Sequence, residues 1–306
     1  MTGRGPFSAE YPFAPNFVEI NGARMHYADI GKGRPFLFLH GNSTWSYMWR
    51  NVMPHLASRG RCIAPDLVGF GKSAKPDINY DYADHPDINY DYADHYGYIE
   101  GFIEALGLKD IILVLHDWGG GLGFNYAMSH QDNVRGVAFM ETFVRTFPSW
   151  DDWPQDLVEG FKQFRTEGVS WELIVEKNVF MEEILPYGIH RDLSEAEMSA
   201  YLEPFRDMAH RKPLWVWPQE LPIEGKPAGT AEIISRYVAA LKTSHMPKLL
   251  FHVQPGAIIP PETVEMCRRD LPNLEDVFLG ESGHYVAEDF PHEVGEKIAQ
   301  WSDAIG

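Results

Sequence analysis

The strongest chemical signal in the sequence is an aspartate in a sharp, glycine-rich turn. Residues 111–115 (IILVL) read as a buried strand, and His116–Gly120 (HDWGG) follow it directly, before a helix expected to start near Leu122. A strand that turns through glycines into a helix is typical of a nucleophile elbow, with Asp117 where serine usually stands. Leu115 replaces the small residue of that motif. Aspartate is also a good helix N-cap, so a structural role for Asp117 stays open.

Two further residues are candidates for a triad with Asp117. His284 lies near the C-terminus, the late position expected when the chain order is nucleophile, acid, histidine. The stretch after the predicted strand 248–253 offers no carboxylate, whereas Glu141 directly follows an apolar run. A carboxylate that emerges from a strand end is costly unless it is paired. We predict that Glu141 orients His284, with a surface histidine as the alternative.

A third site follows the predicted strand 35–39 and has the sequence HGNST at residues 40–44. A Gly-containing turn can aim a backbone N–H at the nucleophile, and the backbone N–H of Trp118 would complete an oxyanion hole. The side-chain amide of Asn42 adds another donor. The motif is short, and a plain turn is the alternative.

The elements that must position these residues are predicted by short apolar runs that alternate with amphipathic stretches. This alternation is typical of an α/β protein with a mainly parallel sheet. The runs are residues 35–39, 61–64, 111–115, 134–140 and 248–253. Ligands of open α/β sheets collect at the carboxyl ends of the strands, where the candidate residues lie.

Between residues 148 and 227 the alternation stops, and helical patterns rich in aromatic residues take over. We predict a helical cap here, inserted into a core domain of residues 1–147 and 228–306. The rings either line a pocket or form ordinary core, because aromatic side chains dominate cores in general. They are Trp150, Trp153, Phe161, Phe164, Trp171, Phe180, Trp215 and Trp217.

A ten-residue segment occurs twice in tandem. Residues 76–85 (PDINYDYADH) recur unchanged as 86–95, just before a helical stretch expected at 96–106. A single perfect repeat of ten residues is not the period of a solenoid. We interpret it as a recent or engineered duplication that lengthens a loop, since added loop length costs little entropy. The alternative is that it reshapes an access route to the pocket.

Composition excludes several classes of protein. The 306 residues carry 26 Lys and Arg against 44 Asp and Glu, a net charge of −18, which disfavours a nucleic-acid footprint. Cys62 and Cys267 are far apart without a CxxC motif, so neither a disulfide framework nor a zinc site is indicated. No signal peptide or run of about 18 apolar residues is present. We expect a cytoplasmic protein that binds neither nucleic acid nor membranes, as a monomer or homodimer.

In combination, the motifs resemble the haloalkane dehalogenases of the α/β-hydrolase superfamily. They are HGN (40–42), DLVGFGKS (66–73), HDWGG (116–120), FME (139–141), Trp217-Pro218 and SGHY (282–285). The resemblance runs from about Phe17 to Trp301 and implies an α/β-hydrolase fold: a mainly parallel eight-stranded sheet flanked by helices, with a helical cap. Glu141 is similar to the acid of the subfamily that keeps glutamate after the sixth strand. The chain departs from the family at Ser43, usually proline, and at the duplicated loop.

The resemblance implies hydrolytic dehalogenation without a metal or organic cofactor, with water as co-substrate and a bound halide ion. Asp117 would attack a small halogenated hydrophobic substrate, His284 would act as general base, and Glu141 would orient it. Asn42 and Trp118 would bind the halide and form the oxyanion hole. The candidates for the pocket wall are Phe143, Phe147, Phe164, Phe180, Ile258 and Tyr285.

Three other functions share parts of this pattern. An epoxide hydrolase would use the same triad with tyrosine donors, for which Tyr187 and Tyr201 are available, but Asn42 argues against it. Residues 150–154 (WDDWP) and 201–205 (YLEPF) look like the coelenterazine-type luciferases of the same fold. A non-catalytic ligand receptor is a third alternative, although an intact triad is more than binding needs.

Overall fold

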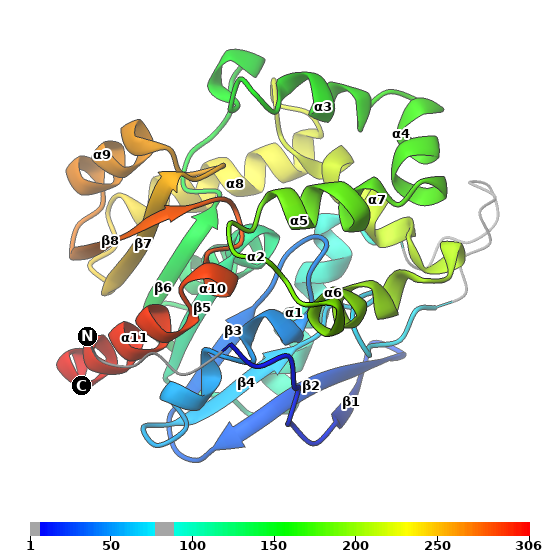
Figure 1. Cartoon of the computed structure of the whole chain (residues 1–306). Coiled ribbons are helices and arrows are strands. Elements are labelled where there is room, and N and C mark those ends of the chain that lie inside the picture. Colours follow the sequence, from blue (N-terminus) through cyan, green and yellow to red (C-terminus); the bar gives the residue numbers. More distant parts are fainter. Residues whose placement is uncertain (1–6, 77–88) are drawn as a thin grey trace.

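The predicted apolar runs form the central strands of one eight-stranded sheet (Figure 1). The computed structural model describes residues 7–76 and 89–306. The strand order is β1-β2-β4-β3-β5-β6-β7-β8, with β1 and β2 antiparallel to their neighbours and all other pairs parallel. The strands are β1 (Asn16–Ile20), β2 (Ala23–Gly31), β3 (Pro35–Leu39), β4 (Arg61–Pro65), β5 (Ile111–His116), β6 (Val134–Thr142), β7 (Lys248–Pro255) and β8 (Leu274–Ser282).

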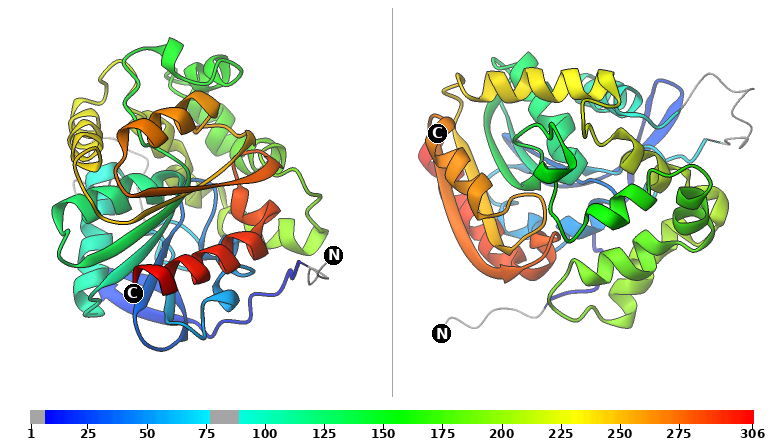
Figure 2. Two further views of the ribbon diagram at one scale, coloured as in Figure 1. Left: turned by 90° about the vertical axis from the view of Figure 1, so that its left-hand side faces the viewer. Right: turned by 90° about the horizontal axis from the view of Figure 1, so that it is seen from above.

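Helices cover both faces of this sheet (Figure 2). On one face α2 contacts both α1 and α8, and on the other α11 packs against the short helix η2. The α-helices are α1 (Tyr92–Ala105), α2 (Asp117–Ser129), α3 (Val158–Gln163), α4 (Val169–Trp171), α5 (Leu185–Tyr187), α6 (Glu195–Leu202), α7 (Lys212–Glu220), α8 (Ala228–Leu241), α9 (Pro261–Asp270), α10 (Val286–Asp289) and α11 (Pro291–Ile305). The shorter helical turns are η1 (Ser46–Trp49), η2 (Met53–His55), η3 (Trp150–Asp152), η4 (Glu172–Glu176), η5 (Phe180–Ile184), η6 (Glu203–Phe205) and η7 (Met208–His210).

The central strands are buried on both sides, which explains their continuous apolar sequences. Every residue of β3 and β5 is buried, as expected for parallel strands covered by helices on two faces. Helices α3 to α7 come from the segment between β6 and α8, and Figure 1 shows them beyond the carboxyl ends of the strands. These ends therefore face a second layer rather than solvent.

Several boundaries differ from those predicted. Helix α2 begins at Asp117, not near Leu122, because the glycines after Asp117 continue the helix. Strand β6 extends to Thr142, so Glu141 lies inside the strand rather than after it. The edge strands β1 and β8 and the inner strand β2 were absent from the predicted runs, and the residues of β8 are mostly half-exposed or exposed.

The second copy of the repeat contributes to the fold at its C-terminal end. Helix α1 begins at Tyr92 rather than at residue 96, and the Asp91 side chain caps it by accepting the Asp94 N–H at 2.9 Å. Tyr92 and His95 are buried. Residues 77–88 lie outside the described residues, and with them the predicted effect of the repeat on loop length or access.

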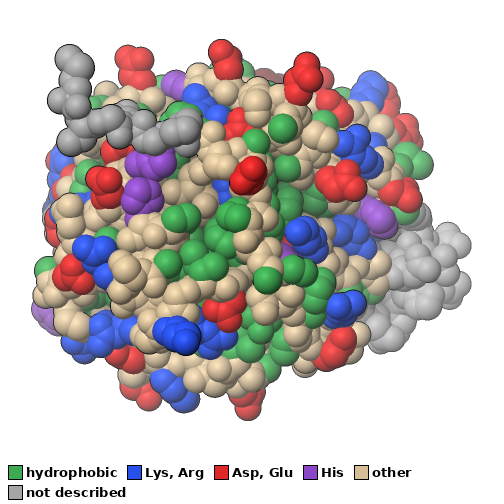
Figure 3. Space-filling model, turned by 60° about the horizontal axis from the view of Figure 1, so that its bottom comes forward, with side chains coloured by type: hydrophobic (Ala, Val, Ile, Leu, Met, Phe, Trp, Pro, Cys, Tyr) green, Lys and Arg blue, Asp and Glu red, His purple; other side chains and the backbone are tan. Residues whose placement is uncertain are grey.

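The two cysteines and the charged side chains of the surface lie as the composition leads us to expect. Cys62 and Cys267 are both free and buried. On the face drawn in Figure 3, Lys and Arg side chains are interspersed with Asp and Glu. This mixture differs from the clustered positive charge that nucleic-acid binding requires. No helix in residues 7–76 and 89–306 has the length and apolar character needed to cross a membrane.

Candidate active site

Asp117 sits at the tip of a strained turn between β5 and α2. Its φ is +50°, in the left-handed region that side chains other than glycine rarely adopt. The turn lies so close to β6 that a Cβ atom on Gly120 would come within 1.8 Å of Thr142 Oγ1. The Thr142 hydroxyl donates to the Asp117 backbone carbonyl at 2.7 Å. The strain is thus held by surrounding packing, as is typical of functional sites.

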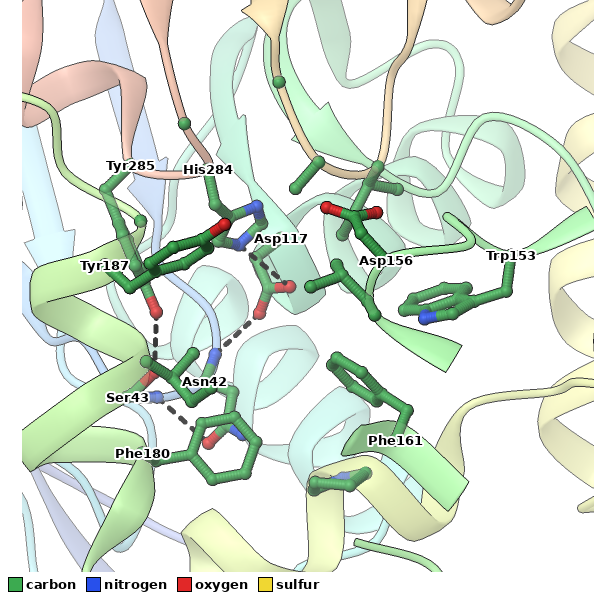
Figure 4. A pocket seen from close by; sticks show the side chains of 18 of the residues that line it. Asn42, Ser43, Asp117, Trp153, Asp156, Phe161, Phe180, Tyr187, His284 and Tyr285 are labelled. Atoms are coloured by element: carbon green, nitrogen blue, oxygen red, sulfur yellow. Dashed lines mark hydrogen bonds and ion pairs between the residues drawn. The ribbon is translucent and has the colours of Figure 1, made fainter. Parts of the chain in front are cut away.

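The two oxygens of the Asp117 carboxylate have different partners (Figure 4). Oδ1 accepts the backbone N–H of Asn42 at 2.7 Å, and Oδ2 lies 3.4 Å from Nε2 of His284. Burial would raise the pKa of Asp117, but His284 and the backbone N–H of Trp118 more than offset this and lower it. These partners favour the ionised carboxylate, and the Asn42 backbone N–H holds Oδ1.

His284 bridges the two candidate carboxylates. Its Nε2 faces Asp117, and its Nδ1 lies 3.4 Å from Oε2 of Glu141. Burial would lower the pKa of His284, but the two carboxylates raise it from 6.5 to about 9. The two carboxylates therefore favour the protonated ring, and the ring in turn favours the ionised form of Asp117. Structure thus brings together the three residues that the sequence suggested.

Glu141 is fixed by the turn that follows β7. Its carboxylate accepts the backbone N–H groups of Ala257 at 2.8 Å, Ile258 at 2.7 Å and Ile259 at 3.3 Å. Glu141 has no exposed surface, and three N–H donors compensate for the loss of water around its charge. The turn after β7 has no carboxylate of its own, but its backbone N–H groups hold the carboxylate of Glu141.

Asn42 lies in a turn whose hydrogen bonds orient its amide. The Ser43 N–H donates to Oδ1 of Asn42 at 3.0 Å, which leaves the NH2 end as the side chain's donor. That end makes only a long contact, 3.4 Å, with the Leu214 carbonyl. The Ser43 hydroxyl forms a 2.9 Å hydrogen bond with the Tyr285 hydroxyl, so this turn and the His284 loop are joined.

The indole of Trp118 lines the same cavity and is held by other rings. It stacks on Trp217 with centroids 4.5 Å apart, and Phe143 packs against it at 4.7 Å. Among the described residues, none accepts a hydrogen bond from the indole N–H. Trp118 and Asn42 therefore both keep donors available to a ligand.

These residues meet in a cavity of about 230 Å³. Of the predicted wall residues, Phe143, Phe180, Ile258 and Tyr285 line it. The prediction is wrong for Phe147 and Phe164, which lie behind the wall: Phe147 packs on Phe143 and Trp153, and Phe164 on Phe161 and Phe180.

Sequence reasoning missed much of the wall, which comes from the 148–227 segment and from the turns after β7 and β8. Trp153 and Phe161 belong to the rings for which a pocket wall and an ordinary core were both left open. The missed residues are Ser43, Trp153, Asp156, Leu157, Phe161, Ile184, Tyr187, Gly188, His190, Pro218, Leu221, Pro255, Gly256, Ala257 and Gly283. No periodic signal separates a ring on the cavity wall from one behind it.

The tyrosines available to an epoxide hydrolase do not form a pair over Asp117. Tyr201 is fully buried, donates its hydroxyl to Glu288 and does not line the cavity. Tyr187 lines the cavity but is 76% exposed. In the described part of the chain, no group of three or more His, Cys, Asp or Glu side chains is arranged to hold a metal ion.

Comparison with known proteins shows to which family the chain belongs. The family model of the alpha/beta hydrolase fold matches residues 34–291. A haloalkane dehalogenase of Mesorhizobium japonicum is 42% identical over 287 residues, 93% of this chain and 89% of the relative. Another from Sphingobium indicum is 43% identical over 289 residues, 92% of this chain and 93% of the relative. The chain belongs to the haloalkane dehalogenases.

Solved structures agree with this assignment. The crystal structure of the dehalogenase DbeA from Bradyrhizobium elkani superimposes with a TM-score of 0.90 at 39% identity, covering 96% of this chain and 98% of that one. The predicted α/β-hydrolase fold, family and enzyme class, a hydrolase of carbon–halide bonds, are confirmed. The dehalogenase interpretation is thereby favoured over luciferase and epoxide hydrolase.

Proposed function

We propose that Asp117 displaces the halogen of a haloalkane and forms an alkyl ester, which water hydrolyses to an alcohol. The observation that carries this proposal is that the two carboxylate oxygens of Asp117 have different partners. Oδ1 accepts the Asn42 N–H at 2.7 Å, while Oδ2 faces His284. We assign the attack to Oδ2, whose partner is the His284 ring at 3.4 Å. Its bond to carbon forms as the carbon–halogen bond breaks, and the halide leaves with the bonding electrons.

The leaving halide is assigned to two donors, the indole N–H of Trp118 and the side-chain NH2 of Asn42. An anion in a largely apolar cavity is costly unless donors are aimed at it. Support comes from the Trp118 indole, which has no acceptor among the described residues, and from the Ser43 N–H, which fixes the Asn42 amide. Chloride or bromide would therefore occupy the resting site.

Hydrolysis of the ester is assigned to His284 and Glu141. Once Asp117 is a neutral ester, His284 gives its proton to solvent. Its Nε2 then takes a proton from water, and the hydroxide adds to the ester carbonyl carbon of Asp117. The backbone N–H groups of Asn42 and Trp118 stabilise the oxyanion at Oδ1. Collapse of this intermediate breaks the ester bond. The added hydroxyl gives its proton to the departing oxygen, so the alcohol leaves, Asp117 returns as a carboxylate, and His284 keeps the proton that it took from water. Glu141, next to Nδ1, orients the ring and stabilises its charged form.

The wider assignments are part of the same proposal. Residues 148–227 act as a helical cap on a core of residues 1–147 and 228–306, supported by the wall residues that this segment contributes. The mostly apolar wall suits a small halogenated hydrophobic substrate, with no nucleic-acid or membrane partner. Two free, buried cysteines support a cytoplasmic location. We assign the enzyme as a monomer or homodimer.

The test is to trap the ester. The variant His284→Ala, incubated with 1-bromobutane, is expected to gain about 56 Da, one butyl group in place of a proton, on the peptide that contains Asp117. One equivalent of bromide per protein should appear without further turnover. The control is the double variant Asp117→Asn/His284→Ala, which should gain no mass. An unmodified His284→Ala protein, or an adduct on another residue, would refute the assignment.

A further inference from the structure

Asp156 places a negative charge on the wall of the cavity. Apart from Asp117, it is the only Asp or Glu among the residues that line the cavity, and no Lys or Arg lines it. Asp156 is an exposed residue of this wall, and Figure 4 shows its carboxylate near Trp153. Within residues 7–76 and 89–306 it has neither a hydrogen bond nor an ion pair. The charge is thus available to a ligand.

The turn that carries Asp156 is held in place. The side-chain NH2 of its neighbour Gln155 donates to the backbone carbonyls of Trp153 at 2.7 Å and Trp150 at 3.1 Å. Upstream, Ser149 and Asp152 cap the short helix η3 with reciprocal hydrogen bonds. These contacts hold the backbone on the N-terminal side of Asp156, so the residue that carries the charge keeps its place in the wall.

Aromatic rings surround this charge. Trp153 and Phe161 pack edge to face with centroids 5.0 Å apart, and both line the cavity next to Asp156. Tyr187, largely exposed, adds a third ring to the lining. A carboxylate combined with aromatic rings is the chemistry that recognises organic cations, because the negative ring faces attract ammonium groups. The overall charge of −18 draws cations toward the protein in addition.

We propose that this dehalogenase prefers haloalkanes with a quaternary or protonated amine at the end remote from the halogen, and discriminates against those with a carboxylate there. Asp156 is the specificity-determining residue, and Trp153 and Phe161 contact the cationic group. The proposal rests on the assigned chemistry at Asp117, which sets the other end of the substrate. It names a substrate class that the family relationship does not specify.

The experiment compares charged probes of matched shape. Bromide release is measured with (ω-bromoalkyl)trimethylammonium ions, 1-bromoalkanes and ω-bromoalkanoates in a series of chain lengths. The readout is the ratio of kcat/KM for the cationic probe to kcat/KM for the anionic probe of equal length. A general loss of activity cancels in this ratio. The length with the largest ratio reports the separation between Asp156 and the reacting carbon.

The variant Asp156→Asn keeps the shape of the side chain and removes its charge. For charges about 8 Å apart, Coulomb's law in water gives roughly a 2.4-fold effect on each probe, so the ratio should fall at least about fivefold. The matched control is Asp151→Asn, an exposed carboxylate of the same stretch that does not line the cavity, and its ratio should equal that of the unmodified enzyme.

Three results would overturn the proposal: a wild-type ratio of one or below, an unchanged ratio in Asp156→Asn, or an equal fall in Asp151→Asn. Failure of the chemistry itself looks different. If the unmodified enzyme releases no bromide from any 1-bromoalkane, the assignment of Asp117 fails and this proposal fails with it. Turnover of 1-bromoalkanes without charge discrimination refutes the role of Asp156 alone.

Discussion

The pKa of His284 should fall when Asp117 loses its charge, and the reaction itself removes that charge. In the free enzyme Oδ2 of Asp117 lies 3.4 Å from Nε2 of His284, and the pKa of His284 is raised to about 9. A base that holds a proton this tightly cannot accept one from water at neutral pH. Alkylation of Asp117 produces a neutral ester, so it removes one of the two charges that raise the pKa.

The variant Asp117→Asn imitates that neutral state and allows the size of the effect to be measured. At 3.4 Å, Coulomb's law gives about 1.2 kcal/mol in water and about 5 kcal/mol at an effective dielectric of 20. At 1.36 kcal/mol per pKa unit, the pKa of His284 should fall from about 9 by roughly one to three and a half units. In Asp117→Asn, the Glu141 carboxylate still keeps the pKa of His284 above that of a buried histidine without a charged partner.

The assay is NMR titration of histidine ring carbons, with the His284 signal assigned through His284→Gln. The control is Asp276→Asn, whose carboxylate contacts His252 at 3.0 Å and not His284. A His284 pKa that is the same in Asp117→Asn and in the unmodified enzyme would refute the reasoning. Because the folded pKa exceeds the ordinary 6.5, the stability from this group is present below pH 6.5 and is lost as pH rises through about 9.

Two further substitutions test the packing that supports the site. A Cβ on Gly41 would lie 2.0 Å from Oδ1 of Asp117, so Gly41→Ala should reduce bromide release on the order of a hundredfold, whereas Gly229→Ala, in open space, should not. The buried guanidinium of Arg50 donates to the Glu288 carboxylate at 2.5 Å, and Glu288→Gln removes the negative charge of this partner. It should cost about 3–5 kcal/mol and lower the unfolding temperature by roughly 5–8 °C in calorimetry, and an unchanged transition would contradict this.

The sequence predicted the chemistry because its residues lie in local motifs at the ends of strands. Strand β3 has the predicted bounds, and β5 differs by one residue, since their apolar runs are continuous and end in glycine turns. Strand ends of a parallel sheet meet at one edge, so correct strands bring Asp117 and Glu141 together. The edge strand β8 was missed because its side chains are partly exposed and lack a continuous apolar run.

The cavity wall could not be predicted, because it depends on tertiary packing within residues 148–227. Phe143 and Phe147 follow the same strand, yet Phe143 lines the cavity and Phe147 packs behind Trp153. Both rings are buried to the same extent. Burial and aromatic character, the properties that a sequence pattern reports, are therefore identical for a wall residue and a core residue. Only the path of the chain after β6 separates them.

Ser43, the residue that departs from the family, shows how a local exception is accommodated. Its φ is +57°, an angle closed to proline, whose ring fixes φ near −65°. The turn therefore relies on hydrogen bonds for its rigidity: the Ser43 N–H, which proline lacks, holds Oδ1 of Asn42, and the Ser43 hydroxyl bonds to Tyr285. The first bond orients the amide assigned to the halide, and the second joins that amide to the loop of His284. In place of a rigid ring, Ser43 thus supplies two hydrogen bonds that connect the Asn42 amide to the loop of His284.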